Sequence, residues 1–67
     1  MINEYKPYVL VKNSDSGEVS ILTKEEWIAN TNSNLDEISQ HETLSNANAG
    51  GILYARGNNL KFKRREY

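Results

Sequence analysis

The side chains that most often carry out catalysis are scarce in this sequence. It contains one histidine, His41, and no cysteine, which excludes disulfides, thiolate nucleophiles and thiolate metal sites. Two pairs of adjacent carboxylates, Glu25/Glu26 and Asp36/Glu37, lie where helices are expected to begin, so helix capping already accounts for them. A chain of 67 residues also has too small a core to enclose a water-excluding pocket. We therefore expect no catalytic residues and a protein that is not an enzyme.

Metal and phosphate sites are not expected either. Glu37 precedes His41 by four residues, a spacing that would place both side chains on one face of a helix. A metal ion needs at least one further ligand, and no other residue is placed to supply it. Residues 48–51, NAGG, contain glycines but lack the Lys-Ser/Thr pair of a phosphate-binding loop. We expect no metal site and no cofactor.

The strongest chemical signal is a cluster of basic residues towards the end of the chain. Residues 50–67 carry five basic side chains against Glu66, a net charge of +4, whereas residues 1–49 carry three lysines against eight acidic residues, a net charge of −5. Aromatic residues accompany the cations, and Tyr, Trp and Arg dominate protein interfaces. The candidate partner-binding residues are Tyr54, Arg56, Lys61, Lys63, Arg65 and Tyr67.

Three roles are open for these basic residues. They could contact an acidic protein, bind the phosphates of a single-stranded nucleic acid while Tyr54 stacks on a base, or merely protect an edge strand from aggregation. Nucleic-acid-binding domains usually have a basic isoelectric point, whereas that of this chain is about 5.7. An approaching polyanion would also be repelled by the acidic remainder, because a Debye length of about 8 Å does not separate the two in so small a molecule. A protein partner is therefore favoured, and single-stranded RNA or DNA is the alternative.

The first element expected to position this cluster is a β-hairpin. Residues 8–11 and 19–22 are rich in β-branched and aromatic side chains, which favour strands. Between them, the polar residues 13–17 end in Gly17 and predict a five-residue loop. In this register Lys12 faces Glu18, Val11 faces Val19, and Val9 faces Ile21.

A short helix should follow the hairpin directly. Thr23 as N-cap and Glu26 three residues later form a capping box, and Leu22 with Trp27 can form the hydrophobic staple. Trp27 and Ile28 are the expected core anchors of this helix. The polar residues 30–34 should end it within two or three turns.

The remaining residues predict a second helix and a second hairpin. Leu35 and Ile38 lie three residues apart, which favours a helix over roughly 35–45 that ends before Gly50 and Gly51, although residues 39–49 could also be a mobile loop. Residues 52–63 predict a hairpin with Gly57-Asn58 as its two-residue loop. One face would pair Ala55 with Leu60 and Leu53 with Phe62, and the other would carry Tyr54, Arg56, Lys61 and Lys63.

These elements predict an α+β fold. The expected architecture is one small domain over residues 1–67, with a four-stranded, mainly antiparallel sheet made of two β-hairpins and one or two short helices between them, in the order ββα(α)ββ. No secretory signal and no segment of membrane-spanning length is visible, so a cytoplasmic protein is expected.

The functional expectation is a small protein-binding module. The asparagine-rich composition is typical of complete small reading frames in bacteriophages and mobile elements, so an inhibitor or accessory factor acting on a host protein is expected. A thin core, free strand edges and halves of opposite charge also favour a homodimer.

Overall fold

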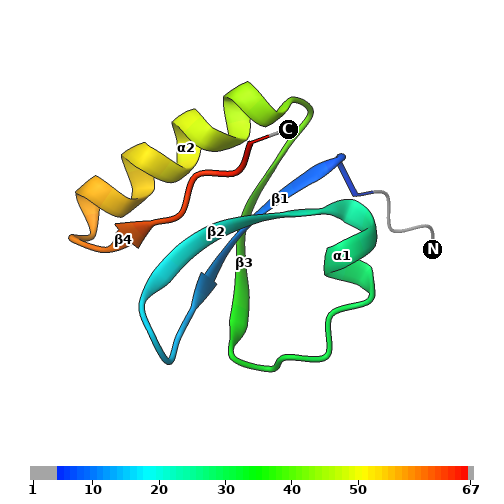
Figure 1. Cartoon of the computed structure of the whole chain (residues 1–67), viewed down its shortest axis with the longest axis horizontal. Coiled ribbons are helices and arrows are strands. Elements are labelled where there is room, and N and C mark those ends of the chain that lie inside the picture. Colours follow the sequence, from blue (N-terminus) through cyan, green and yellow to red (C-terminus); the bar gives the residue numbers. More distant parts are fainter. Residues whose placement is uncertain (1–4, 67) are drawn as a thin grey trace.

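The computed structural model describes residues 5–66, which form an α+β fold with a four-stranded mixed sheet and two helices (Figure 1). The strand order is β3-β1-β2-β4; β1 runs antiparallel to both neighbours, and β2 runs parallel to β4. The predicted α+β class is confirmed, but the fourth strand is parallel to its neighbour rather than part of a hairpin. In chain order the elements are β1 Tyr8–Asn13, β2 Glu18–Thr23, α1 Lys24–Ile28, β3 Leu35–His41, α2 Leu44–Gly57 and β4 Lys61–Phe62.

The first hairpin forms where predicted, but its turn is one residue shorter than expected. Asn13 belongs to β1, and its carbonyl accepts from the Gly17 N–H at 2.7 Å. Its side chain also accepts from the N–H groups of Asp15 and Ser16, which fixes the turn locally. Gly17 has a φ of +75°, a conformation that glycine adopts without steric cost. The loop is therefore four residues long.

This shorter loop moves the strand register by one position. Leu10 pairs with Ile21, and Lys12 pairs with Val19, so the predicted register is wrong. A slip of one residue exchanges the two faces of a strand. Leu10 and Ile21 consequently join the cluster beneath α2, while Val9 and Val11 lie outside that cluster and are fully buried within the central strand.

The predicted capping box of α1 is confirmed. The Thr23 hydroxyl accepts from the Glu26 N–H at 3.2 Å, and the Glu26 carboxylate accepts from the Thr23 N–H at 2.8 Å. The prediction that Ile28 anchors the core is wrong, because its side chain is 64% exposed, and Trp27 is half-buried. The helix has only five residues and follows β2 directly, next to the start of β1 (Figure 1).

The predicted second helix over 35–45 is wrong, since Leu35–His41 form the strand β3 beside β1. Ser39 pairs with Leu10 and Glu37 with Val11, so Ile38 is the extra residue of a β-bulge. The bulge turns Ile38 towards the core cluster. The three-residue spacing from Leu35 to Ile38 therefore comes from a strand irregularity rather than a helical turn.

The predicted second hairpin is also wrong, because Leu44–Gly57 form the helix α2. Its buried stripe repeats every three or four residues and is made mostly of small side chains. Gly50 and Gly51 lie inside this helix rather than ending it. A Cβ atom added at Gly51 would lie 2.6 Å from Cζ of Phe62, so the missing side chain is what allows Phe62 to pack there. The stripe consists of Leu44, Ala47, Asn48, Gly51 and Ala55.

The end of α2 reverses the chain and produces β4. Asn59 has a φ of +55°, and its N–H donates to the Arg56 carbonyl, while the Leu60 N–H donates to the Ala55 carbonyl at 2.8 Å. This pair of hydrogen bonds is a Schellman motif, and Leu60 packs against the core cluster that contains Ala55. The reversal directs residues 61–62 along β2.

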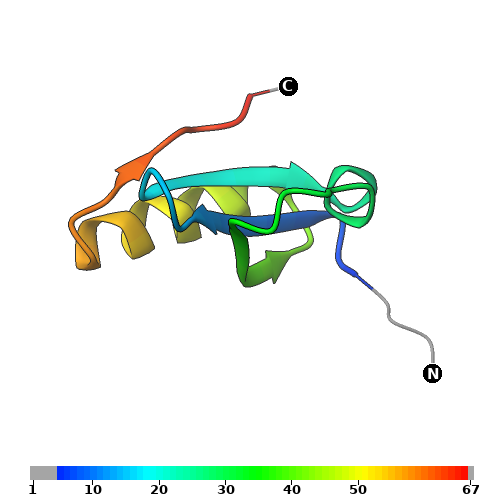
Figure 2. The ribbon, with the colours of Figure 1, turned by 90° about the horizontal axis from the view of Figure 1, so that it is seen from below.

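The helix α2 covers one face of the sheet, and β3 and β4 lie at opposite edges (Figure 2). The core lies between this helix and the sheet. None of the helices in residues 5–66 is long and apolar enough to cross a membrane. The buried cluster consists of Leu10, Val19, Ile21, Leu44, Ala47 and Ala55, with Tyr8, Ile38, Tyr54, Leu60 and Phe62 packed against it.

Candidate interaction surface

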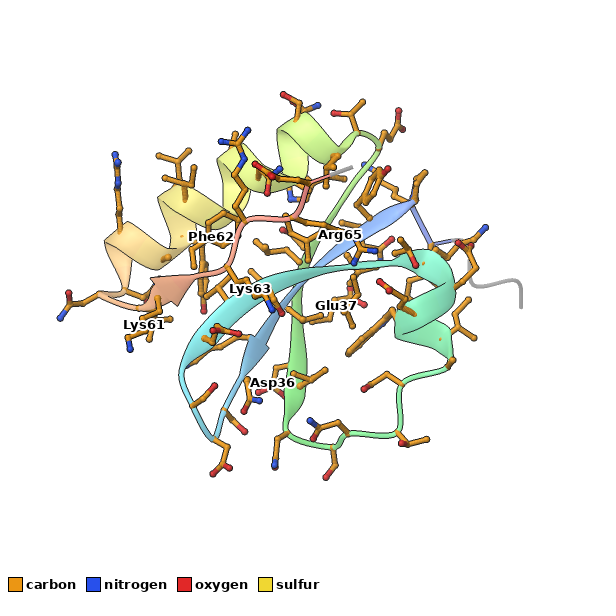
Figure 3. The ribbon with its side chains drawn as sticks, in the orientation of Figure 1. Asp36, Glu37, Lys61, Phe62, Lys63 and Arg65 are labelled. Atoms are coloured by element: carbon orange, nitrogen blue, oxygen red, sulfur yellow. The ribbon has the colours of Figure 1, made fainter. Side chains whose placement is uncertain are left out.

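The basic residues of the C-terminal segment, residues 61–66, are held between β2 and α2. The Lys63 N–H donates to the Val19 carbonyl at 2.9 Å and so extends the parallel pairing by one bond beyond β4. Phe62 points towards α2, whereas Lys61 and Lys63 point away from it (Figure 3). Both lysines are exposed. The packing of Phe62 therefore fixes which way the two lysines face.

Arg65 anchors the far end of this segment through its backbone. Asn48 on α2 is a buried polar residue, 8% exposed. Its side-chain amide donates to the Arg65 carbonyl at 2.9 Å and accepts from the Arg65 N–H at 3.1 Å. The Asn48 side chain thus pairs with the segment much as a neighbouring strand would, and both of its polar atoms are satisfied.

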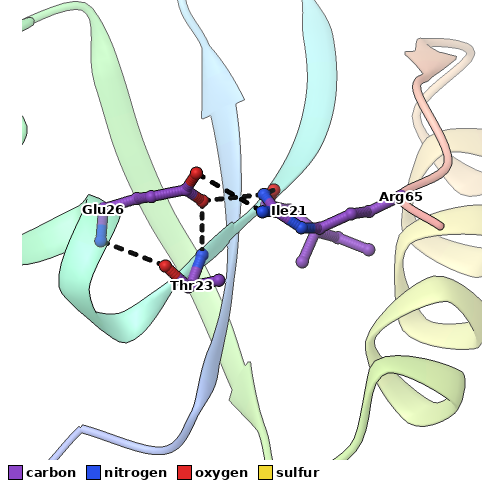
Figure 4. A network of polar contacts seen from close by, with 4 residues as sticks. All are labelled: Ile21, Thr23, Glu26 and Arg65. Atoms are coloured by element: carbon purple, nitrogen blue, oxygen red, sulfur yellow. Dashed lines mark hydrogen bonds and ion pairs between the residues drawn. The ribbon is translucent and has the colours of Figure 1, made fainter. Parts of the chain in front are cut away.

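The Arg65 guanidinium makes a second set of contacts, with β2 and α1 (Figure 4). Nη1 donates to the Ile21 carbonyl at 3.1 Å and to Glu26 Oε1 at 2.7 Å, and Nη2 donates to Glu26 Oε2 at 3.3 Å. Within residues 5–66, this is the single ion pair between side chains. Arg65 was expected to steer a partner, but its guanidinium is already occupied inside the molecule.

The Glu26–Arg65 pair substitutes for a neighbouring strand along the outer edge of β2. Beyond the last β4 bond, the Ile21 carbonyl receives a hydrogen bond from Arg65, and the Thr23 N–H donates to Glu26. The hydrogen bond from the Thr23 backbone, followed by that from Arg65, lowers the pKa of the Glu26 carboxyl below its ordinary value of 4.5. Side chains therefore satisfy backbone groups that an edge strand would otherwise present to another chain.

Two shallow hollows flank the C-terminal segment. One of about 370 Å³ lies between residues 63–66 and β2, where it is lined by Ser20, Ile21 and Leu22 among others. The second, of about 330 Å³, lies between residues 64–66 and the first turns of α2. The segment thus forms a ridge with a depression on each side, and exposed Lys63 and Arg64 line these depressions.

The other predicted contact residues do not share one strand face with the lysines, as had been expected. Tyr54 is half-buried on α2 and packs against the core cluster, so it does not lie among the cations. Arg56 is exposed in the last turn of the same helix. Tyr67 lies outside the described residues. The structure therefore brings together Lys61, Lys63 and the anchored Arg65, and separates Tyr54 from them.

Acidic side chains gather at the opposite edge of the sheet. Asp36 and Glu37 are consecutive, exposed residues of β3 (Figure 3). Glu42 is exposed just beyond the end of this strand. Glu37 Oε2 accepts from the Gln40 side chain at 3.1 Å. Other acidic residues lie beside the basic segment, since Glu18 of β2 pairs with Lys61 and Glu26 forms an ion pair with Arg65, but Asp36 and Glu37 give the β3 edge an acidic character of its own.

The His41 side chain contacts neighbouring residues of β3 and α2. Its Nε2 lies 2.8 Å from the Ser39 hydroxyl, and its ring lies against Gly50 of α2, where an added Cβ would be 3.0 Å from Cε1. The part of the chain that the structure describes contains no cluster of three His, Cys, Asp or Glu side chains that could hold a metal ion.

Sequence reasoning did not identify Asn48 and Phe62 as the residues that hold the basic segment in place. The spacing of small residues at 47, 51 and 55 was an available signal, because it marks the face of a helix that a neighbour can approach closely. Comparison with family models, with curated proteins and with solved structures yields no match to this chain.

Proposed function

We propose that the chain is a non-enzymatic protein-binding module that contacts an acidic surface of its partner through Lys61, Lys63 and Arg64. The supporting observation is that these exposed cations project from a segment that Phe62, Asn48 and Arg65 fasten to the fold. The backbone of this segment is already ordered, so only the side chains lose conformational entropy when a partner binds. Charge of this kind mainly accelerates association and selects the partner.

A protein partner accounts for this surface better than a nucleic acid does. Single-strand binders stack bases on exposed aromatic side chains. Phe62 faces α2 and Tyr54 packs against the core cluster, so neither is offered beside the exposed lysines. In keeping with the composition, we propose that the chain is encoded by a bacteriophage or mobile element and acts as an inhibitor or accessory factor on a protein of the host cell.

The test is capture of partners by the immobilised protein from a lysate of the host cells, followed by identification of the retained proteins by mass spectrometry. The wild-type chain is compared with Lys61→Gln/Lys63→Gln and with the matched control Lys6→Gln/Lys24→Gln, which removes the same charge elsewhere. We expect a protein that the wild type and the control retain and that the Lys61/Lys63 variant loses.

Binding kinetics with the purified partner then test the role of the charge. Lys61→Gln/Lys63→Gln should lower the association rate about tenfold at low salt and flatten its salt dependence, with a smaller change in dissociation. Retention of RNA or single-stranded DNA in place of a protein, abolished by the same substitutions, would reverse the proposal. If both double variants capture the same amount of partner, Lys61 and Lys63 do not form the binding surface.

A further inference from the structure

The outer edge of β3 is open. The Ser14 N–H donates to the Asn34 carbonyl, so Ser14, and by alternation Lys12 and Leu10, direct their backbone groups towards β3. The backbone groups of Glu37 and Gln40 are then directed away from β1. Among residues 5–66, neither another strand nor a side chain bonds to these groups, in contrast to the capped edge of β2.

The outer edge of β4 is open as well. Lys61 and Lys63 direct their backbone groups towards β2, as the bond from the Lys63 N–H to Val19 shows. The N–H and carbonyl of Phe62 therefore face outwards. Figure 2 shows β3 and β4 at opposite edges of the sheet, with no further element of the described chain beyond either.

The two open edges carry opposite charge on the same face of the sheet. Glu37 pairs with Val11, which lies outside the cluster beneath α2, so Glu37 is on the face away from this helix. Phe62 packs on Gly51 of α2, so its neighbours Lys61 and Lys63 are also on the face away from the helix. A sheet continued from one molecule to the next, with α2 of every copy on the same side, would therefore bring Glu37 of one copy to Lys61 and Lys63 of another.

We propose that a second copy of this chain docks on the acidic edge of β3 through the basic edge of its β4, in a head-to-tail arrangement. The alternative symmetric pairing of two β3 edges would place Asp36 and Glu37 of both copies together, and this repulsion disfavours it. A head-to-tail contact uses different surfaces on its two sides, so it extends into short open chains rather than closing into a dimer. The inference rests on the proposed function only in treating Lys61 and Lys63 as contact residues.

The test uses the purified protein alone, in sedimentation velocity over a range of concentrations at low and high salt. We expect the average mass to rise with concentration at low salt and to fall to that of a monomer at high salt. Asp36→Asn/Glu37→Gln and Lys61→Gln/Lys63→Gln should each weaken association about tenfold or more. Asp15→Asn/Glu25→Gln, which removes the same acidic charge from exposed positions elsewhere, should leave association unchanged.

A mixture of the two edge variants distinguishes the proposed geometry from other contacts. The Asp36/Glu37 variant keeps its basic edge, and the Lys61/Lys63 variant keeps its acidic edge, so together they should form a species of twice the monomer mass and nothing larger. Slower amide hydrogen exchange at Glu37 and Gln40 on association should accompany it.

Monomeric protein at low salt and high micromolar concentration would overturn the inference, as would association that survives Asp36→Asn/Glu37→Gln. Neither result would affect the proposed function, which lysine-dependent capture of a foreign protein tests separately. Conversely, self-association without such capture would leave this inference standing and remove the proposed function.

Discussion

Replacing Gly51 by alanine tests the contact between α2 and the C-terminal segment. In the interior of an exposed helix this substitution normally stabilises by about 1 kcal/mol, because alanine has the higher helix propensity. Here the new Cβ would lie 2.6 Å from Cζ of Phe62, closer than carbon atoms approach without repulsion. The ring must therefore move, and overpacking of this kind costs about 1–3 kcal/mol.

The net expectation for Gly51→Ala is a loss of about 1 kcal/mol of the free energy of unfolding. For a domain of this size, that corresponds to a fall of about 4–8 °C in Tm. Thermal and urea unfolding followed by far-UV circular dichroism measure it. Gly57→Ala is the matched control, because nothing lies within 4 Å of a Cβ added there, and it should be neutral or slightly stabilising.

The same substitution in a Phe62→Ala background gives the sharper result. Without the ring, Gly51→Ala should become stabilising by up to about 1 kcal/mol, so the two positions should show a coupling energy of about 2 kcal/mol. If Gly51→Ala raises Tm in the otherwise unchanged chain, Phe62 does not pack on this glycine and the assigned position of β4 is wrong.

Substitutions at three further positions test other features of the fold. Thr23→Ala should lower the free energy of unfolding by about 1 kcal/mol in urea titrations through loss of the α1 cap, and an unchanged midpoint would contradict the capping box. The pKa of Glu26 is lower in the folded chain than its ordinary 4.5, so the stability it contributes is present above pH 4.5 and is lost as the pH falls through the folded pKa. Between these two pKa values, the free energy of unfolding should therefore fall less steeply with decreasing pH in Glu26→Gln than in the wild type. Equal slopes for the two proteins would count against the carboxylate contacts. Asn59→Gly should preserve or raise Tm, whereas Asn59→Ala should cost about 1 kcal/mol because of its positive φ, and equal Tm values would exclude the left-handed cap.

Local signals in the sequence predicted α1 because the residues involved are adjacent. Thr23 and Glu26 satisfy each other's backbone groups within one turn, so no distant part of the chain was needed to infer this start. The hairpin before it was located for a similar reason. The predicted register of this hairpin was wrong because Asn13 was assigned to the loop. The hydrogen bond from the Gly17 N–H to its carbonyl places Asn13 in β1 instead.

The second half of the chain was mispredicted because tertiary contacts outweigh its local propensities. Ile52, Leu53 and Tyr54 favour a strand, yet they lie in α2, and Gly50 and Gly51 weaken the helix that contains them. The close approach of His41 and Phe62 to those glycines explains their presence, but it involves residues that only the fold brings together. In β3, the bulge at Ile38 produced a spacing that resembles a helical repeat.

The candidate surface was predicted in composition but not in arrangement. The cations at 61 and 63 were expected to be exposed on one face, and they are. Arg65 could not be assigned to a structural role from the sequence, because its partners Glu26 and Ile21 are 39 and 44 positions away.

That long separation also has a kinetic consequence. Contacts between residues 44 positions apart require a large loop to close before they form, and the loop entropy delays them relative to the turn of the hairpin and the first turn of α1. Arg65 is therefore expected to reach β2 after the main barrier to folding has been crossed. Its contacts would then mainly lower the unfolding rate, and so lengthen the lifetime of the native state, with little effect on the folding rate.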